Sequence, residues 1–387
     1  MEQSGNLTLF FQNFTSVHFD KDPFLVPYYL GRLLNCSVTI LYPKRTGVNL
    51  PKEYKGVKLL GFEVTESNSP RIRYCSILEY IKQNANRIKY LMLYFGYTDS
   101  EVFAKIYKKY NNKGKIYVKM DIDPSTIITL DDLPFWKRPF SYCKNKILRY
   151  SFLKRVDVAS CEISEAYNKL RTGKVPFYGF GKKLLLAPNG IDEESIKSMG
   201  YTKSEFRHKE NIFITVGRLG TYQKNTEMLL KALENVDLQD WKVYLIGTID
   251  KEFESIKQSF IKNHPELDDK VIWAGPINNR KTLYDFYDRS KVFLLPSRYE
   301  GYAIVLAESQ RFSNYIISTP SGPIKDIFAK CDCGEIIPNN DDKALSNAIK
   351  NVVCGKTNVD RYNSFDYTSL SWENRLTHVA QALKNSI

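Results

Sequence analysis

The sequence lacks any apolar run that approaches the length of about 18 residues expected of a membrane-spanning helix. Its first residues, MEQSGNLTLFFQNFTS, lack the basic start and long apolar segment of a secretory signal. No low-complexity tract or internal repeat is present, which argues against a disordered chain or a solenoid. We therefore expect a globular, cytoplasmic protein that is neither secreted nor threaded through a membrane.

Paired cysteines and metal-ligand clusters are also lacking. The seven cysteines are an odd number without paired spacing, and no His or Cys cluster complements Cys331 and Cys333 to complete a zinc site. The signatures GxSxG and HExxH do not occur, and the Gly-Lys-Thr at 355–357 is no phosphate loop because Lys350 takes the place of its first glycine. The sequence thus predicts reduced thiols and neither a bound metal nor a cofactor.

What the chain does contain predicts two α/β domains. It has 387 residues, more than one hydrophobic core usually serves, and 43% of them are hydrophobic. Short β-branched or aromatic runs alternate with helical patterns in both halves, which is typical of parallel sheets with helices on both faces. These runs are LTLFFQN, SVTILY, IKYLMLYF, KIYVKM, NIFITVG, WKVYLIG, KVIWAG, KVFLLP and NYIIST.

The boundary between the domains is expected at the turn formed by Pro-Asn-Gly at 188–190. We predict one doubly wound, Rossmann-like domain over residues 1–189 and a second over 190–367, with a polar linker at 194–211. The last segment has the apolar spacing of a helix, and about 368–387 is long enough to pack back on the first domain.

The net charge of +13 is confined to the first half of the chain. Residues 1–182 hold 29 Lys or Arg and 16 Asp or Glu, whereas residues 183–387 hold 27 of each kind. This asymmetry favours an anionic partner, with ordinary solubilising lysines as the alternative.

The basic excess is densest at 135–155, FWKRPFSYCKNKILRYSFLKR, with seven Lys or Arg, six aromatics and no acid. Such a mixture suits peripheral contact with an anionic membrane at the inner face of the cell, where a lipid-linked acceptor would be found. An amphipathic helix that packs its aromatics into the first domain explains the pattern equally well. No nucleic-acid reading module is recognisable, so no nucleic-acid partner is expected.

Two carboxylates frame an apolar run in PSRYEGYAIVLAES, residues 296–309. Glu300 and Glu308 are eight residues apart, which corresponds to about 80° around a helix, so both can line one wall of a cleft. The simpler alternative makes Glu300 a partner of the helix dipole and Glu308 a solvated surface residue. Arg218 and Lys224 flank another strand-to-helix loop, and two cations at a helix N-terminus suit a diphosphate.

Together these stretches resemble the retaining glycosyltransferases of family 4. The similarity is carried by NIFITVGRLGTYQKNTEMLLKAL, KVFLLPSRYEGYAIVLAES, LLLAPNGID, CGEIIPNNDD and SWENRL, in the family's order over about residues 183–385. The resemblance implies the GT-B fold, two Rossmann-like domains that face a cleft, and a reaction that proceeds without a metal ion.

The resemblance also implies roles for single residues. Glu300 would lie against the donor sugar, Glu308 would accept hydrogen bonds from the ribose, and Arg218 and Lys224 would hold the diphosphate. The remaining donor contacts would come from the backbone at Gly217, Gly301, Tyr302, Ala303 and Ile304.

In the first half the resemblance is looser. The family's glycine pair is missing from the first loop, FTSVHFDKDPFLVP, where His18 is either a cleft residue or an ordinary loop histidine. Asp121 and Asp123 end the run KIYVKM, where relatives often carry His. Either aspartate can contact a donor or acceptor hydroxyl, or it can cap the turn at Pro124.

The predicted function is transfer of a sugar from a nucleotide-diphosphate donor to a glycan or lipid-linked acceptor in cell-surface polysaccharide synthesis. A GT-B enzyme that epimerises or hydrolyses a nucleotide sugar is the enzymatic alternative. A basic membrane adaptor that has kept the fold without turnover is the non-enzymatic one.

Overall fold

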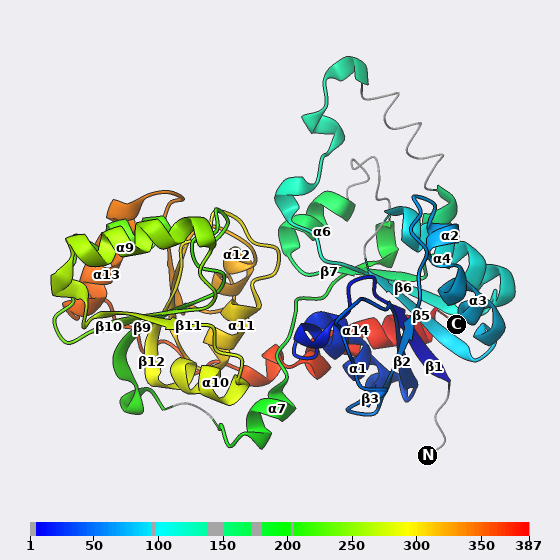
Figure 1. The fold of residues 1–387 in the computed structure, drawn as a ribbon, viewed down its shortest axis with the longest axis horizontal. Coiled ribbons are helices and arrows are strands. Elements are labelled where there is room, and N and C mark those ends of the chain that lie inside the picture. The colour runs from blue at the N-terminus through cyan, green and yellow to red at the C-terminus, as the bar shows by residue number, and fades with distance from the viewer. Residues whose placement is uncertain (1–4, 95–96, 138–149, 172–179, 203–204, 387) are drawn as a thin grey trace. The chain divides into compact units, whose positions relative to one another are not determined.

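The computed structural model describes residues 5–94, 97–137, 150–171, 180–202 and 205–386. The chain divides into two compact units, which we call unit 1 (residues 1–192 and 371–387) and unit 2 (residues 193–370). The last helix of the chain therefore belongs to unit 1 (Figure 1). Residues 138–149, the middle of the segment expected at a membrane, lie outside the described residues.

Unit 1 is built on an eight-stranded sheet in the order β3-β4-β2-β1-β5-β6-β7-β8. All pairs are parallel except the short β3–β4 pair. The central strands are rich in β-branched and aromatic residues buried on both faces, as expected for a covered parallel sheet. The strands are β1 (Asn6–Phe10), β2 (Ser37–Pro43), β3 (Glu53–Tyr54), β4 (Val57–Phe62), β5 (Ile88–Tyr94), β6 (Lys115–Met120), β7 (Val158–Cys161) and β8 (Leu184–Leu186).

Helices cover both faces of this sheet. On one face α1 and α14 contact each other and share a core with the strands (Figure 1). On the other face Phe103 of α4 stacks on Phe10 of β1, with ring centroids 4.1 Å apart. The helices are α1 (Asp22–Leu34), α2 (Pro70–Arg73), α3 (Cys75–Asn84), α4 (Tyr97–Tyr110), α6 (Ser164–Arg171) and α14 (Trp372–Asn385).

Local sequence explains where α1 and α14 begin and end. Pro23 stands in the first turn of α1, where its missing N–H leaves no hydrogen bond unmade, and Asn35 ends the helix with a φ of 53°. The Ser371 hydroxyl caps α14 by accepting a hydrogen bond from the backbone N–H of Asn374 at 3.3 Å.

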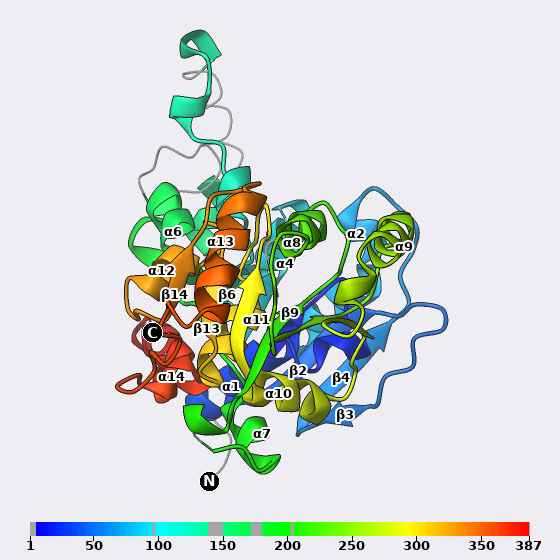
Figure 2. The same ribbon diagram turned by 90° about the vertical axis from the view of Figure 1, so that its left-hand side faces the viewer.

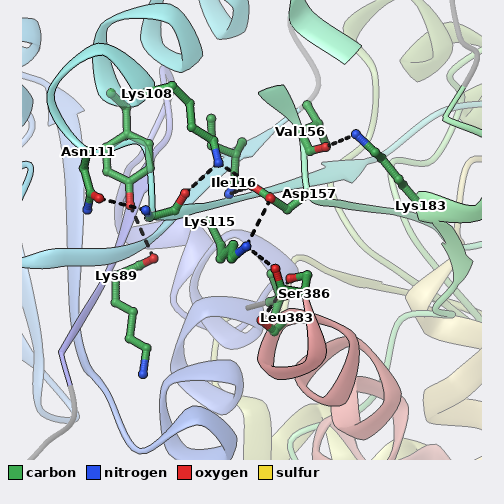
Figure 3. A network of polar contacts seen from close by, with 12 residues as sticks. Lys89, Lys108, Asn111, Lys115, Ile116, Val156, Asp157, Lys183, Leu383 and Ser386 are labelled. Carbon is green, nitrogen blue, oxygen red and sulfur yellow. Dashed lines mark hydrogen bonds and ion pairs between the residues drawn. The ribbon is translucent and has the colours of Figure 1, made fainter. Parts of the chain in front are cut away.

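A polar network around Asp157 ties the amino ends of β6 and β7 to α4 and α14 (Figure 3). Its carboxylate accepts hydrogen bonds from Lys108 Nζ at 2.9 Å and from the backbone N–H of Ile116 at 2.8 Å. Lys115 reaches the same carboxylate and also donates to the carbonyl of Ser386 just after α14. Part of the basic excess of the first half therefore serves the structure rather than a partner.

Unit 2 carries a six-stranded parallel sheet in the order β11-β10-β9-β12-β13-β14. Helices lie on both sides of it, with α9 and α13 on one side and α10 on the other (Figure 1), and α8 contacts α13 (Figure 2). The strands are β9 (Glu210–Val216), β10 (Lys242–Ile246), β11 (Val271–Gly275), β12 (Ser290–Leu295), β13 (Tyr315–Ser318) and β14 (Gly334–Ile336). The helices are α7 (Glu193–Ser198), α8 (Thr226–Leu233), α9 (Glu254–Asn263), α10 (Arg280–Arg289), α11 (Ile304–Arg311), α12 (Ile324–Phe328) and α13 (Asp342–Val353).

Both units are doubly wound, as predicted, and each run predicted as a strand forms one. The prediction of a linker over 194–211 is wrong at its start, because these residues open with most of α7. Ile196 of this helix is fully buried, and Glu193 pairs with the buried Arg311 at 2.6 Å. Five strands, β3, β4, β7, β8 and β14, were not predicted, and four of them have only two to four residues.

Candidate donor site in unit 2

The order of the strands in unit 2 fixes where a ligand is expected. After β9, strands β10 and β11 are added to the sheet on one side of β9. Strand β12 then pairs with the opposite side of β9. This reversal makes the carboxyl ends of β9 and β12 a topological switch point, the usual ligand site of open α/β sheets. The loops that leave these two strands contain most of the predicted donor residues, and Ile304 and Glu308 lie in the helix that follows the second loop, α11.

Lys224 and Glu300 form an ion pair between these two loops. Lys224 Nζ lies 2.7 Å from Glu300 Oε1, and the Glu300 residue is only 6% exposed. Glu300 precedes the first residue of α11 by four positions, so the helical angle used to relate it to Glu308 does not apply. It is held by Lys224 rather than by the helix.

Gln223 connects the other predicted cation to this pair. Its side-chain N–H donates to Glu300 Oε2 at 3.2 Å, and its side-chain oxygen accepts from Arg218 at 2.9 Å. Its backbone carbonyl accepts from the N–H of Arg298 at 2.8 Å. Sequence reasoning missed Gln223, because a glutamine in a polar loop carries no distinct signal.

Glycines allow the backbone to pack tightly behind this network. Gly247 has a φ of 143°, and a Cβ there would lie 1.7 Å from the carbonyl oxygen of Gly217. A Cβ on Gly322, where φ is 58°, would lie 2.9 Å from Cβ of Glu300. Only glycine fits these two positions. Gly247 packs against the loop that carries Lys224, and Gly322 packs against the loop that carries Glu300, so both loops are held in place.

A buried hydroxyl without a partner lies close to the cations. Ser297 is fully buried, and its Oγ has no hydrogen-bond partner among the described residues. With Gly217, Lys224 and Pro296 it lines a small cavity at the end of β12. Buried hydroxyls are nearly always satisfied, so this one indicates a place for a bound water or a ligand oxygen.

Glu308 has a different set of partners. Its Oε1 accepts from Arg280 at 2.8 Å and its Oε2 from the Tyr287 hydroxyl at 3.1 Å. Glu308 is 2% exposed, so the alternative that it is a solvated surface residue is wrong. Arg280 and Tyr287 come from α10, and neither could be predicted from the sequence because both lie in an ordinary amphipathic helix.

Helix α11 brings backbone donors to the same edge of the sheet. It begins at Ile304 with Ala303 as its N-cap, directly after Tyr302. The N–H groups of a first helical turn have no partner within the helix and attract anions. Gly301 precedes this turn, and its carbonyl would lie 2.9 Å from a Cβ on Gly322.

The predicted residues of unit 1 have mostly local contacts. The ring nitrogen Nδ1 of His18 accepts a hydrogen bond from the N–H of Thr15 at 3.0 Å, and burial lowers the pKa of this histidine. Asp123 accepts from the N–H of Ser125 at 2.9 Å and so caps the turn that contains Pro124. Asp121 follows β6 at the carboxyl edge of the sheet with an exposed side chain.

Behind Asp121 lies a buried ion cluster that the sequence analysis missed. Lys119 is 1% exposed, pairs with the buried Glu162 and lies 3.4 Å from Asp22 at the start of α1. Asp22 also accepts a hydrogen bond from the Tyr94 hydroxyl at 3.0 Å. The signal was a lysine inside the strand KIYVKM, whose neighbours are all buried. This edge of unit 1 is therefore rich in carboxylates.

Neither a metal cluster nor a membrane span is found in the part of the chain that the structure describes. No group of three or more His, Cys, Asp or Glu side chains there could hold a metal ion. No helix among these residues is long and apolar enough to cross a bilayer.

Comparison with known proteins shows what this fold and most of unit 2 are similar to. Residues 201–367 match the model of the family "Glycosyl transferases group 1". Most of unit 2 is therefore similar to these glycosyltransferases, and the fold of the whole chain is the GT-B fold of solved glycosyltransferases.

The relatives are bacterial. The amylovoran biosynthesis glycosyltransferase AmsD of Erwinia amylovora is 33% identical over 28% of this chain and 29% of its own length. The capsular polysaccharide biosynthesis glycosyltransferase CapH of Staphylococcus aureus is 24% identical over 62% of this chain and 65% of its own. The chain thus matches less than two thirds of either relative.

One solved structure shows the likeness over nearly the whole length. The pneumococcal O-GlcNAc transferase GtfA, in complex with UDP and GlcNAc, superposes with a TM-score of 0.67. The match covers 99% of each chain at 12% identity, which supports a shared fold. It confirms the predicted two-domain GT-B architecture.

Proposed function

We propose that this protein is a retaining glycosyltransferase that takes a sugar from a nucleotide-diphosphate donor bound by unit 2. The acceptor is a glycan or a lipid-linked glycan bound by unit 1, and the product contributes to a cell-surface polysaccharide. The names of AmsD and CapH, which refer to amylovoran and capsular polysaccharide, support the product class. The UDP in GtfA supports a nucleoside diphosphate as the leaving group.

The convergence of Arg218, Lys224 and Glu300 at one switch point carries this proposal. When the glycosidic bond to the phosphate breaks, positive charge develops on the sugar and negative charge on the departing diphosphate. Fixed cations stabilise that charge without having to reorganise. Arg218 offers a planar fork and Lys224 a point charge, which together suit a diphosphate.

The other donor contacts follow from the same placement. Glu300 lies against the donor sugar, and Glu308 accepts hydrogen bonds from the ribose hydroxyls. The N–H groups from Tyr302 to Ile304 meet the sugar and the phosphate, and Gly217 and Gly301 let the loops approach the ligand closely.

The proposed reaction needs no covalent intermediate on the protein. The acceptor oxygen forms its bond to the anomeric carbon on the face that the phosphate leaves, so the configuration is retained. The departing phosphate oxygen takes the proton of the acceptor hydroxyl, and no metal ion is required.

The acceptor is assigned to the carboxylate-rich edge of unit 1. Asp121 is exposed there, with Lys119 and Asp22 behind it. Carboxylates accept hydrogen bonds from sugar hydroxyls, and like charge disfavours a phosphate at this edge. We assign Asp121 to the acceptor hydroxyl, and His18 and Asp123 to supporting positions in the surrounding loops.

Residues 135–155 are proposed to contact an anionic membrane. Among the described residues of this segment, Phe135 is 81%, Trp136 75% and Tyr150 61% exposed, whereas Phe152 is buried. Exposed rings beside Lys and Arg suit the headgroup region. Binding to vesicles of phosphatidylglycerol, but not of phosphatidylcholine, should depend on Phe135 and Trp136. Equal failure to bind both kinds of vesicle would contradict the assignment.

A thermal-shift screen with UDP, GDP, ADP, CMP and TDP, each with and without EDTA, tests the donor site. A ligand that binds only the folded state must stabilise it. We expect one nucleotide to raise the melting temperature independently of EDTA, and Glu308→Ala to abolish this shift. No shift with any nucleotide would contradict the proposal. Free sugar as the product from the matching nucleotide sugar would indicate an epimerase or hydrolase instead.

A further inference from the structure

The Glu308 carboxylate is held by Arg280 and Tyr287, and neither of these residues has a role in the proposed binding of the donor. The carboxylate is 2% exposed, and each of its oxygens accepts one hydrogen bond, Oε1 from Arg280 and Oε2 from Tyr287. A carboxylate can accept about four hydrogen bonds, so both oxygens keep capacity for ligand hydroxyls.

The two partners differ in how firmly they are fixed. Tyr287 is fully buried, stacks on Phe293 of β12 and on Phe312, and burial beside Glu308 raises the pKa of its phenol, which therefore stays protonated and donates. Arg280 is the first residue of α10, its side chain is 26% exposed, and its guanidinium lies 5.0 Å from the ring centroid of Tyr284.

Arg280 orients Glu308 through its positive charge more than through the surface area that the two side chains bury. A buried carboxylate without a cation would be strongly disfavoured, and it would turn toward any other donor within reach. With Arg280 on one oxygen and Tyr287 on the other, the carboxylate has a single orientation. A preorganised acceptor distinguishes ligands that supply the matching hydroxyl from ligands that lack it, because the remaining lone pairs of the fixed, buried carboxylate are then left without a donor.

We propose that Arg280, supported by Tyr287, positions Glu308 and thereby sets the preference of this protein for ribonucleotides over 2′-deoxyribonucleotides. The inference rests on the proposed function, in which Glu308 accepts hydrogen bonds from the ribose. Arg280 is a positioning residue: it acts through Glu308 and touches no reacting atom.

The test is calorimetric binding of UDP and 2′-deoxy-UDP, with GDP and 2′-deoxy-GDP as a second pair, to full-length protein. A hydrogen bond to a charged group supports a preference of roughly 10- to 100-fold for the ribonucleotide in the wild type. Arg280→Ala should weaken ribonucleotide binding and bring the ratio close to one. Arg280→Lys should restore part of the ratio, and Tyr287→Phe, which keeps the packing, should lower it by a smaller factor.

Arg289→Ala is the matched control. Arg289 ends the same helix, and it pairs with Glu210 at 2.6 Å on the surface, so its loss should leave the ratio unchanged. The inference is overturned if Arg280→Ala weakens both members of a pair equally or changes neither. Failure of the wild type to bind any of the four nucleotides is a separate outcome, and it would refute the donor site itself if ADP, CMP and TDP also failed to stabilise the protein.

Discussion

Lys224 and Glu300 pair at 2.7 Å although they are 76 residues apart in the sequence. Their side chains are 16% and 7% exposed, so both charges are largely removed from water. The cation proposed for the diphosphate and the carboxylate proposed for the sugar therefore neutralise each other before a ligand binds. A phosphate bound by Lys224 would therefore share this ammonium group with Glu300.

Replacing Lys224 by Met should abolish sugar transfer and also destabilise the fold. The change leaves Glu300 as an uncompensated charge, which should lower the free energy of unfolding by about 2–3 kcal/mol, somewhat less than for a fully buried pair. The double variant Lys224→Met/Glu300→Gln should recover the stability but not the transfer. Urea unfolding and a transfer assay measure the two effects, and turnover in the double variant would refute the catalytic role of the pair.

Gln223→Leu should weaken nucleotide binding about tenfold, as expected when a hydrogen bond to a charged group is lost. The amide links Arg218 to Glu300, so its loss frees both side chains without removing a charge. Stability should change little, because Gln223 is not in the core. Gln258→Leu, which removes a similar contact to Glu254 on the surface of α9, is the control. Equal affinities in the two variants, measured by calorimetry, would contradict a role for Gln223.

Comparing the stability of Gly247→Ala with that of Gly275→Ala distinguishes the cost of a steric clash from the cost of backbone strain. Both glycines have positive φ, but a Cβ at Gly275 meets nothing within 4 Å, whereas one at Gly247 meets the Gly217 carbonyl. The substitution at Gly275 should cost only about 1 kcal/mol, the usual cost of a left-handed alanine. The substitution at Gly247 should cost several times more and weaken nucleotide binding by moving Gly217. Similar denaturation midpoints for the two variants would refute this account.

The stability of unit 1 should carry a pH-dependent contribution from Glu162. Burial raises the pKa of Glu162 from 4.5 to about 8, although Lys119 pairs with it, while Asp22 and Asp121 act in the same direction as burial. The folded state therefore binds this proton more tightly than the unfolded state. Its contribution is fully present below pH 4.5 and is lost as the pH rises toward 8.

Glu162→Gln removes this titration while keeping the shape of the side chain. Relative to the variant, the wild type should lose stability steadily as the pH rises from 5 to 8, measured by urea unfolding at each pH. A difference between the two proteins that does not vary with pH would show that Glu162 has the same charge in the folded and the unfolded state.

Local sequence was sufficient to predict most of the longer strands of this protein. Strands such as KVFLLP and NIFITVG are recognisable because burial on both faces demands continuous apolar runs. The loops after them carry Arg218, Lys224 and Glu300 within eight residues of the strand ends, and the diphosphate site that this placement predicts stays a prediction. Four short strands could not be predicted, because runs of two to four residues carry no measurable periodicity.

The tertiary structure alone decided which charges meet. Glu300 finds Lys224, Glu308 finds Arg280 and Lys119 finds Glu162 across 76, 28 and 43 residues of sequence. Such partners depend on strand order and on which helix covers which face, and a one-dimensional pattern contains neither. In the two pairs of unit 2 the carboxylate is buried, so the attraction between the charges is weakly screened, and the fold, rather than composition, determines the electrostatics of the donor site.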